Sequence, residues 1–472
     1  MRRARLLTTS ALTAALLATA ACSLAPPYVA PTTVAPPAFK EVAGWTQATP
    51  ADAVPRGSWW TIFGDPVLDD LEARSERASP TLAAALARYD AARGLADVTA
   101  ADLVPTVTAN ASAGRTRASG GRPLGGGTAA TYNEFSIGAT LDYELDLWGR
   151  VRNSVRADRA DAAASKADLA AVRLSLQASV ADAYFRLRGL DAEAALLDQT
   201  VKAYERALDL TTTRHDGGIA SGLDVSRSEN ILSAARAQIS ATANQRAVTE
   251  HEIAALVGEV ASSFAITPLV RPLEPPAVAA GVPSQLVERR PDVAEAERRI
   301  AAANFRIGVA RAAYFPNISL GLGGGVEATS GSLFSSPAIF WGLGPAQALL
   351  TLFDGGRRRA QVRISRAQYD EAAASYRSTV LTAFREAEDQ LAATRHLAAQ
   401  AIDQQAAAAA AERTRELALT RYRDGASDYL DVVTAQTASL DAERAALAVQ
   451  TNRMQTAVAL VRALGGSYVP EA

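Results

Sequence analysis

Arginine, tyrosine and carboxylate side chains gather in a short turn that this chain contains twice. The stretch from Thr420 to Val432 shares its frame with the stretch from Thr213 to Val225, at one offset of 207 residues. The matched positions are Arg214 with Arg421, Gly218 with Gly425, Asp224 with Asp431 and Val225 with Val432. These side chains can form reversible ion pairs and hydrogen bonds between helices, and carboxylates that line a pore can select cations.

Each turn lies between segments that have helical periodicity. Apolar residues recur at alternating spacings of three and four before the first turn, within Val151 to Leu210, which predicts a helix of about 90 Å with a coiled-coil seam. A second long helix is predicted from Arg357 to about Arg421. Glycine in each turn supplies the left-handed backbone that ends a helix and reverses the chain. Both hairpins should therefore end at the same level of one assembly.

The turn residues also have a simpler interpretation. Aspartate at the start of a helix accepts hydrogen bonds from free backbone N–H groups and is favoured by the helix dipole. Asp224 and Asp431 can therefore act only as helix caps, and Asp428 is an equally good cap for the last helix. A helical hairpin loop without further function remains an alternative for each turn taken alone.

Alternating apolar and polar residues precede each long helix and predict four strands. The strands are expected at about 105–114, 134–146, 316–323 and 338–353, and the fourth alternates poorly. In the second, Phe135, Ile137 and Leu141 face one side while Ser136 and Asp142 face the other. Strands of this kind suit a membrane barrel with a polar lumen, and a soluble amphipathic hairpin is the alternative.

Composition excludes several classes of protein. A net charge of −2 gives no strong attraction to nucleic acid. The single cysteine excludes an internal disulfide, and the three histidines, His215, His251 and His396, lack the spacing of metal ligands. We therefore expect no enzyme, no cofactor, no metal site and no nucleic-acid partner.

The N-terminus has the pattern of a bacterial lipoprotein signal. A basic start, an apolar run from Leu6 to Ala18 and small residues lead to Cys22, which such a signal leaves acylated as the first mature residue. Thr19 stands where that pattern usually has leucine, and an ordinary secretory signal with a chance cysteine is the alternative. The prediction is a signal peptide over 1–21 and a proline-rich tether over 22–58.

The remaining chain divides into two repeats. Repeat 1 is predicted over 59–258, a proline-rich linker over 259–290, repeat 2 over 291–465 and a short tail over 466–472. Four strands leave two open edges, and closed membrane barrels have about eight strands or more, so copies of the chain must complete the barrel. The sequence thus predicts a mainly α protein with a transmembrane β-barrel.

Several motifs, in their order along the chain, resemble the outer membrane factor family of TolC-like and OprM-like exit ducts. They are Trp59-Trp60, Arg289-Arg290-Pro291-Asp292, Tyr314-Phe315-Pro316, Phe353-Asp354-Gly355-Gly356-Arg357 and Arg421-Tyr422-Arg423. The resemblance implies a homotrimer with a 12-stranded barrel and an α-helical periplasmic tunnel. It also implies a lipid anchor in the outer membrane, partnership with a periplasmic adaptor and an inner-membrane RND-type pump, and efflux of small molecules such as drugs.

The same resemblance assigns a periplasmic gate to the repeated turns. It implies that Arg421 and Tyr422 hold the closed state, that Leu430 lies at the constriction and that Asp431 lines the pore. The candidate gate residues are Arg421, Tyr422, Leu430, Asp431, Asp428, Asp224 and Arg214. Two positions depart from the family pattern, since Thr434 replaces a second carboxylate and Thr437 an arginine. A duct for type I protein secretion and a structural envelope lipoprotein without a channel remain the alternatives.

Overall fold

The computed structural model describes residues 23–29, 39–40, 57–121, 128–271, 274–276, 289–329 and 338–466. The predicted acylation site Cys22, the signal peptide, most of the tether, residues 272–273 and 277–288 of the linker, and most of the C-terminal tail lie outside these residues. No helix in the described part of the chain combines the length and the hydrophobicity needed to cross a bilayer.

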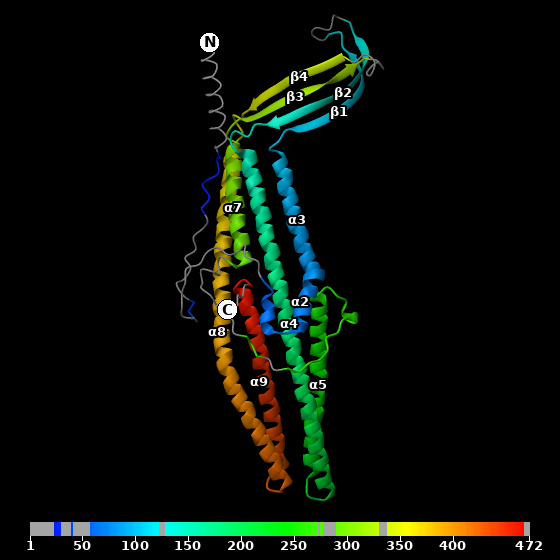
Figure 1. The fold of residues 1–472 in the computed structure, drawn as a ribbon, viewed down its shortest axis with the longest axis vertical. Coiled ribbons are helices and arrows are strands. Elements are labelled where there is room, and N and C mark those ends of the chain that lie inside the picture. The colour runs from blue at the N-terminus through cyan, green and yellow to red at the C-terminus, as the bar shows by residue number, and fades with distance from the viewer. Residues whose placement is uncertain are drawn as a thin grey trace. The chain divides into compact units, whose positions relative to one another are not determined.

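Helices and strands follow one another twice in the same order (Figure 1). Repeat 1 contains η1 Trp59–Phe63, α2 Pro66–Ala78, α3 Pro80–Ala101, β1 Thr106–Ala118, β2 Ala130–Glu144, α4 Arg150–Asp216 and α5 Gly222–Leu256, and η2 Ala261–Ser263 follows in the linker. Repeat 2 contains α7 Pro291–Ala312, β3 Asn317–Ala328, β4 Ala338–Leu349, α8 Arg357–Arg423 and α9 Tyr429–Ala463. Corresponding helices have equal lengths of 22 residues for α3 and α7, 67 for α4 and α8, and 35 for α5 and α9. The predicted tandem repeat is therefore confirmed.

The chain forms two compact units. The unit called here the sheet unit contains the described residues of Met1–Thr32, Arg88–Lys166 and Glu295–Tyr376. The other, called the hairpin unit, contains those of Thr33–Ala87, Ala167–Ala294 and Arg377–Ala472.

A four-stranded antiparallel sheet in the order β1-β2-β3-β4 occupies the sheet unit. Its register places apolar residues opposite one another, for example Val107 opposite Leu141 and Leu141 opposite Leu322. Neighbouring positions pair polar residues, such as Ser112 with Ser136, whose hydroxyl oxygens are 2.8 Å apart. Because side chains alternate along a strand, one face of the sheet is apolar and the other polar.

The strands differ from the predicted ones at their ends. β1 and β3 continue further into the loops than the alternation indicated, to Ala118 and Ala328. β4 ends earlier, at Leu349. Its alternation is weak because the pairing of β3 with β4 shifts between Leu320 and Leu322, where the sequence Gly344-Pro345 interrupts the ladder.

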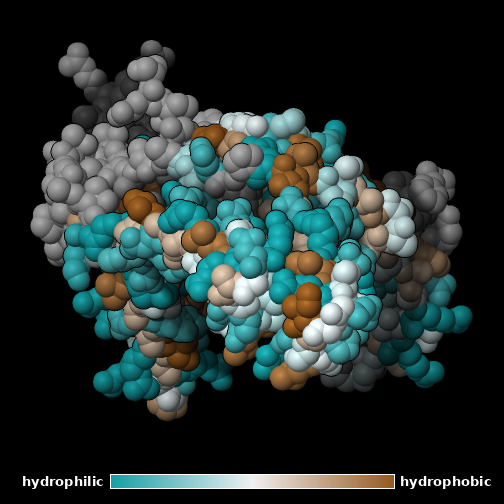
Figure 2. All heavy atoms as spheres, turned by 90° about the horizontal axis from the view of Figure 1, so that it is seen from below, coloured by the Kyte–Doolittle hydropathy of each residue, from teal (hydrophilic) through white to brown (hydrophobic). Residues whose placement is uncertain are grey.

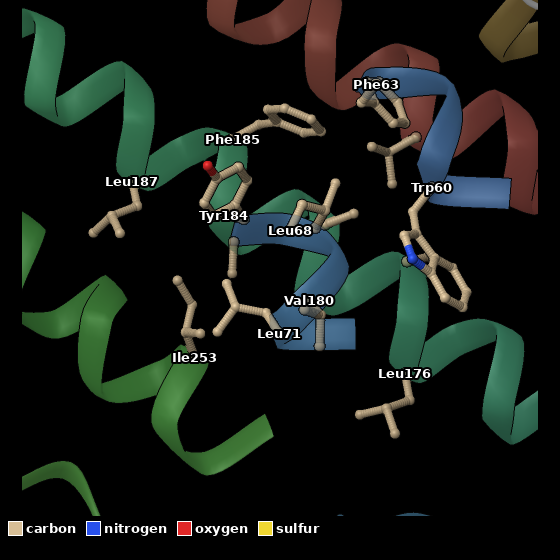
Figure 3. Close-up of a cluster of buried hydrophobic side chains, with 14 of the residues drawn as sticks. Trp60, Phe63, Leu68, Leu71, Leu176, Val180, Tyr184, Phe185, Leu187 and Ile253 are labelled. Atoms are coloured by element: carbon tan, nitrogen blue, oxygen red, sulfur yellow. The ribbon is translucent and has the colours of Figure 1, made fainter. Parts of the chain in front are cut away.

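The main core of the hairpin unit lies where η1 and α2 pack on α4, α5 and α9 (Figure 3). In that view Trp60, Phe63, Leu68 and Leu71 approach a row of α4 side chains that includes Tyr184. Burying these large side chains stabilises the middle of the hairpin unit, since each contributes about 1.5–3 kcal/mol. The long helices continue beyond this core to the repeated turns.

Candidate gate at the repeated turns

Both repeated turns end a long helix in the same way. Gly218 and Gly425 have positive φ angles of 73° and 76°, the left-handed conformation predicted from the sequence. After α4 the Ile219 N–H donates to the Arg214 carbonyl at 2.8 Å, and after α8 the Ala426 N–H donates to the Arg421 carbonyl at 2.7 Å. These bonds satisfy carbonyls that a helix leaves free at its C-terminus. The two hairpins α4–α5 and α8–α9 are thus closed by equivalent turns, seen at the bottom of Figure 1.

Two of the carboxylates predicted for the gate, those of Asp224 and Asp428, cap the starts of helices. Ser221 and Asp224 form a capping box at the start of α5, in which the Asp224 carboxylate accepts from the Ser221 N–H and hydroxyl. The Asp224 carboxylate also lies 3.5 Å from a guanidinium nitrogen of Arg227. At the start of α9, Asp428 is the cap and accepts from the Asp431 N–H at 3.2 Å. Asp224 and Asp428 therefore have local structural roles.

Arg214 connects the two hairpins. Its Nη1 donates to the carbonyl oxygens of Tyr422 at 2.9 Å and Arg423 at 3.1 Å. Its guanidinium carbon lies 4.6 Å from the centroid of the Tyr422 ring. A cation over an aromatic face and two charged hydrogen bonds are strong contacts when partly buried. The end of α4 is thereby attached to the last turn of α8.

A small aromatic cluster lies next to this attachment. Tyr422 and Tyr429 are buried, with ring centroids 5.2 Å apart in an edge-to-face arrangement, and Val432 packs with them. Burial raises the pKa of the Tyr429 hydroxyl above its ordinary value. Further up the hairpins, the Tyr204 hydroxyl of α4 donates to the Gln436 carbonyl of α9 at 3.2 Å. The tips are consequently held together within one protomer by both packing and hydrogen bonds.

The other predicted gate residues lie on the surface of the protomer. Arg421 is exposed, and its guanidinium reaches the Ala426 carbonyl only at 3.4 Å. Asp431 is exposed, and Leu430 is 47% exposed. Thr434 and Thr437 are exposed too. The sequence prediction grouped Arg421 with Tyr422, but the structure separates them: Tyr422 points inward and pairs with Arg214, while Arg421 points outward.

Two exposed apolar residues at the tips were not predicted. Leu223, the counterpart of Leu430 at the same offset, is 58% exposed, and Ile219 is 71% exposed. The repeat itself could have revealed Leu223. Figure 2 views the end of the molecule on which the turns lie, and apolar spheres are scattered there among hydrophilic ones rather than gathered in a single patch.

The contacts at the hairpin tips are hydrogen bonds, an ion pair and ring contacts. Among the described residues, no group of three or more histidine, cysteine, aspartate or glutamate side chains could hold a metal ion. His215 uses its Nδ1 for a 2.9 Å hydrogen bond to the Ala220 carbonyl within its own turn. What the tips offer is a set of non-covalent links that can break and re-form, beside exposed carboxylate and leucine side chains.

Comparison with known proteins agrees with this description. The family model of outer membrane efflux proteins matches residues 73–259 and 282–466. The chain is 33% identical over 427 residues to the pyoverdine export outer membrane protein OpmQ of Pseudomonas aeruginosa, covering 89% of each chain. It is 33% identical over 429 residues to the antibiotic efflux pump outer membrane protein ArpC of Pseudomonas putida, covering 90% of this chain and 87% of ArpC. The solved structure of the outer-membrane channel OprN matches with a TM-score of 0.86 and 31% identity, over 94% of this chain and 99% of that one.

Two repeats of strands and long helical hairpins, matching that channel over almost their full length, define an outer-membrane channel fold. The chain belongs to the outer membrane efflux protein family. It is an outer-membrane component of an efflux system, and the family consists of transport channels rather than enzymes.

Proposed function

We propose that three copies of this chain form one duct, which carries small organic molecules from the periplasm to the exterior. The observation that carries this proposal is the sheet. Its outer strands β1 and β4 each pair on one side only among the described residues, and one face is apolar. Unpaired edges are not tolerated in lipid, so the edge of β4 pairs with β1 of the next copy and twelve strands close a barrel. The exposed residues Ile339, Trp341 and Leu343 of β4 suit a surface that meets lipid or a second copy.

The partners proposed for the duct are a periplasmic adaptor and an inner-membrane RND-type pump. The cargo class follows from relatives that are named for the export of pyoverdine and of antibiotics. These cargoes are small organic molecules of different chemistry. A wide duct with a polar interior, rather than a selective binding site, is the design that accommodates both.

The proposed gate is the set of links at the hairpin tips. Arg214 attaches α4 to the end of α8 within each protomer, and opening requires the α8–α9 tip to leave the α4–α5 tip. The exposed residues Arg421, Leu430 and Asp431 are available to neighbouring copies. Three Asp431 carboxylates around the axis repel one another, which favours passage of cations and eases release of the closed state.

Acylation of Cys22 is proposed as a second membrane attachment. Ser23 and Leu24 follow it directly, and Ser23 is compatible with sorting to the outer membrane. A single lipid chain gives only marginal binding to a membrane, but here it adds to a barrel.

The proposal is tested by reconstituting the purified full-length chain in planar bilayers. A trimeric duct that is closed at rest should show a small, cation-preferring conductance. A trimer that inserts into the membrane but conducts no ions would overturn the proposal in favour of a structural envelope lipoprotein. In cells, a deletion strain that accumulates a secreted protein but not small dyes would instead point to a type I secretion duct.

A further inference from the structure

The residues that follow Cys22 are held against helices of the sheet unit by a row of hydrogen bonds. The Ser23 hydroxyl donates to the Asn153 side-chain oxygen of α4 at 2.9 Å. The Leu24 carbonyl accepts from Arg311 Nη1 at 3.2 Å. Further along, the Pro26 carbonyl accepts from the Asn304 side-chain nitrogen at 2.9 Å. The Tyr28 hydroxyl donates to the Glu297 carboxylate.

The partners on α7 recur with a period of seven. Glu297, Asn304 and Arg311 are separated by two helical turns each, which places them on one face of the helix. Their order is the reverse of the order of their partners, so residues 23–28 run antiparallel to α7. Asn304 is only 3% exposed, and a buried amide without a hydrogen-bond partner is destabilising, so its bond to the Pro26 carbonyl is needed.

Gly308 lies on α7 between Asn304 and Arg311, at the point of closest approach. A Cβ atom at this position would stand 2.8 Å from both the backbone nitrogen and the Cβ of Ala25, and 2.6 Å from the Asn153 side-chain nitrogen. Contacts below 3.0 Å to backbone cannot be accommodated without a shift. Glycine in a helix interior is destabilising relative to alanine, so its presence here is explained by the segment that lies over it.

We infer that this face of α7, together with Asn153, is a peptide-binding seat for residues 23–28 of the same chain. The seat recognises the segment through the Leu24 and Pro26 carbonyls, the Ser23 and Tyr28 hydroxyls, and a small residue at position 25. The first residues of the tether are therefore bound to the helices by specific contacts. This inference goes beyond the proposed function.

The consequence concerns where the anchor lies. Ser23 contacts α4 close to its first residue, Arg150. Arg311 lies next to the last residue of α7, six positions before β3 begins at Asn317. The seat thus holds Ser23, the residue after Cys22 in the sequence, beside the ends of the strands. A lipid on Cys22 would enter the bilayer next to the barrel wall; this step alone rests on the proposed acylation.

A disulfide cross-link tests the seat in the full-length protein. Ser23→Cys with Asn153→Cys should cross-link rapidly and in most chains under mild oxidation. The control pair is Ser23→Cys with Lys166→Cys, since Lys166 is exposed about 20 Å further along α4 and should not react. Mass analysis of the N-terminal peptide reports acylation separately, so failure of the lipid anchor is distinguished from failure of the seat.

Two further variants probe the seat itself. Gly308→Ala, added to the reactive pair, should slow cross-linking about tenfold because the segment is displaced. Gly94→Ala in α3 is the matched control, because it is also a helical glycine but its Cβ would meet open space. Asn304→Ala should likewise slow the reaction and does not alter the helix at Gly308. Equal cross-linking of both cysteine pairs, or no effect of either seat variant relative to Gly94→Ala, would overturn the inference.

Discussion

Arg214 of repeat 1 and Tyr422 of repeat 2 are in direct contact at the hairpin tips. The Arg214 guanidinium covers the face of the Tyr422 ring and donates to the Tyr422 carbonyl at 2.9 Å. The two residues are 208 positions apart and come from different repeats, so this contact exists only if both hairpins end at one level. It also makes the two repeats unequal: at the corresponding place in the other turn, Arg421 is exposed.

Replacing Asp431 should change the ion selectivity of the duct. Asp431→Asn removes one carboxylate per copy and should lower the cation-to-anion permeability ratio severalfold. The reversal potential in a salt gradient across a planar bilayer measures this ratio. The control is Glu229→Gln, which removes an exposed carboxylate of α5 and should leave the permeability ratio nearly unchanged. An unaltered ratio for Asp431→Asn would remove this residue from the pore lining.

A buried ion network should make the middle of the hairpin unit sensitive to one carboxylate. Asp191 is buried and accepts from Arg188 at 2.9 Å, from Arg246 at 2.7 Å and from the Leu269 N–H at 3.1 Å. Asp191→Ala removes the buried carboxylate that these three donors share and should lower the free energy of unfolding by about 3–5 kcal/mol. Denaturant titration measures the loss. The control Asp198→Ala removes an exposed pair with Lys202 and should cost about 1 kcal/mol or less, so similar effects of both variants would contradict the prediction.

Stability should fall with rising pH because of Glu72. Its side chain is fully buried in α2, and burial, with Glu76 and Asp69 nearby, raises its pKa to about 9 from 4.5. Between these values the folded chain keeps a proton that the unfolded chain has lost, so the free energy of unfolding decreases as the pH increases. From pH 5 to pH 8 the loss is about 4 kcal/mol at most.

Glu72→Gln should remove this part of the pH dependence. Unfolding midpoints of wild type and variant, measured from pH 5 to pH 8, should therefore diverge, with the variant relatively more stable at the higher pH. Asp70→Asn on the same helix, at an exposed carboxylate paired with Arg74, is the control and should follow wild type. Parallel curves for wild type and Glu72→Gln would show that Glu72 is ionised in the folded chain.

Helices and turns could be predicted from the sequence to within a few residues. The long helix predicted from Val151 to Leu210 begins one residue earlier, at Arg150, and continues to Asp216. The apolar period of this helix is sustained, and glycine with a positive φ marks its end, so local chemistry decides both features. Strand ends were less exact, since a strand ends where its partner stops pairing, and that is not encoded locally.

The contacts within the candidate gate could not be predicted in the same way. Arg421 and Tyr422 are neighbours in sequence and were expected to act together, but successive residues on a helix point about 100° apart. Tyr422 therefore faces the core while Arg421 faces solvent. The partner of Tyr422 is Arg214, and no local pattern indicates a contact over 208 residues. The ion network around Asp191 could not be predicted either. The corresponding residue in repeat 2 is Ala398, so comparing the two repeats does not indicate the network.

The single-channel conductance of Arg214→Ala is the most direct test of a duct held shut by links between its hairpin tips. Loss of the cation–π contact and two hydrogen bonds should weaken the closed state by about 2 kcal/mol per protomer. One such loss alone changes the ratio of open to closed channels about 30-fold. Arg206→Ala, an exposed arginine two turns earlier on α4, should keep the wild-type conductance. A large, sustained conductance is expected for Arg214→Ala only; wild-type conductance in a correctly inserted Arg214→Ala trimer would contradict the proposed gate.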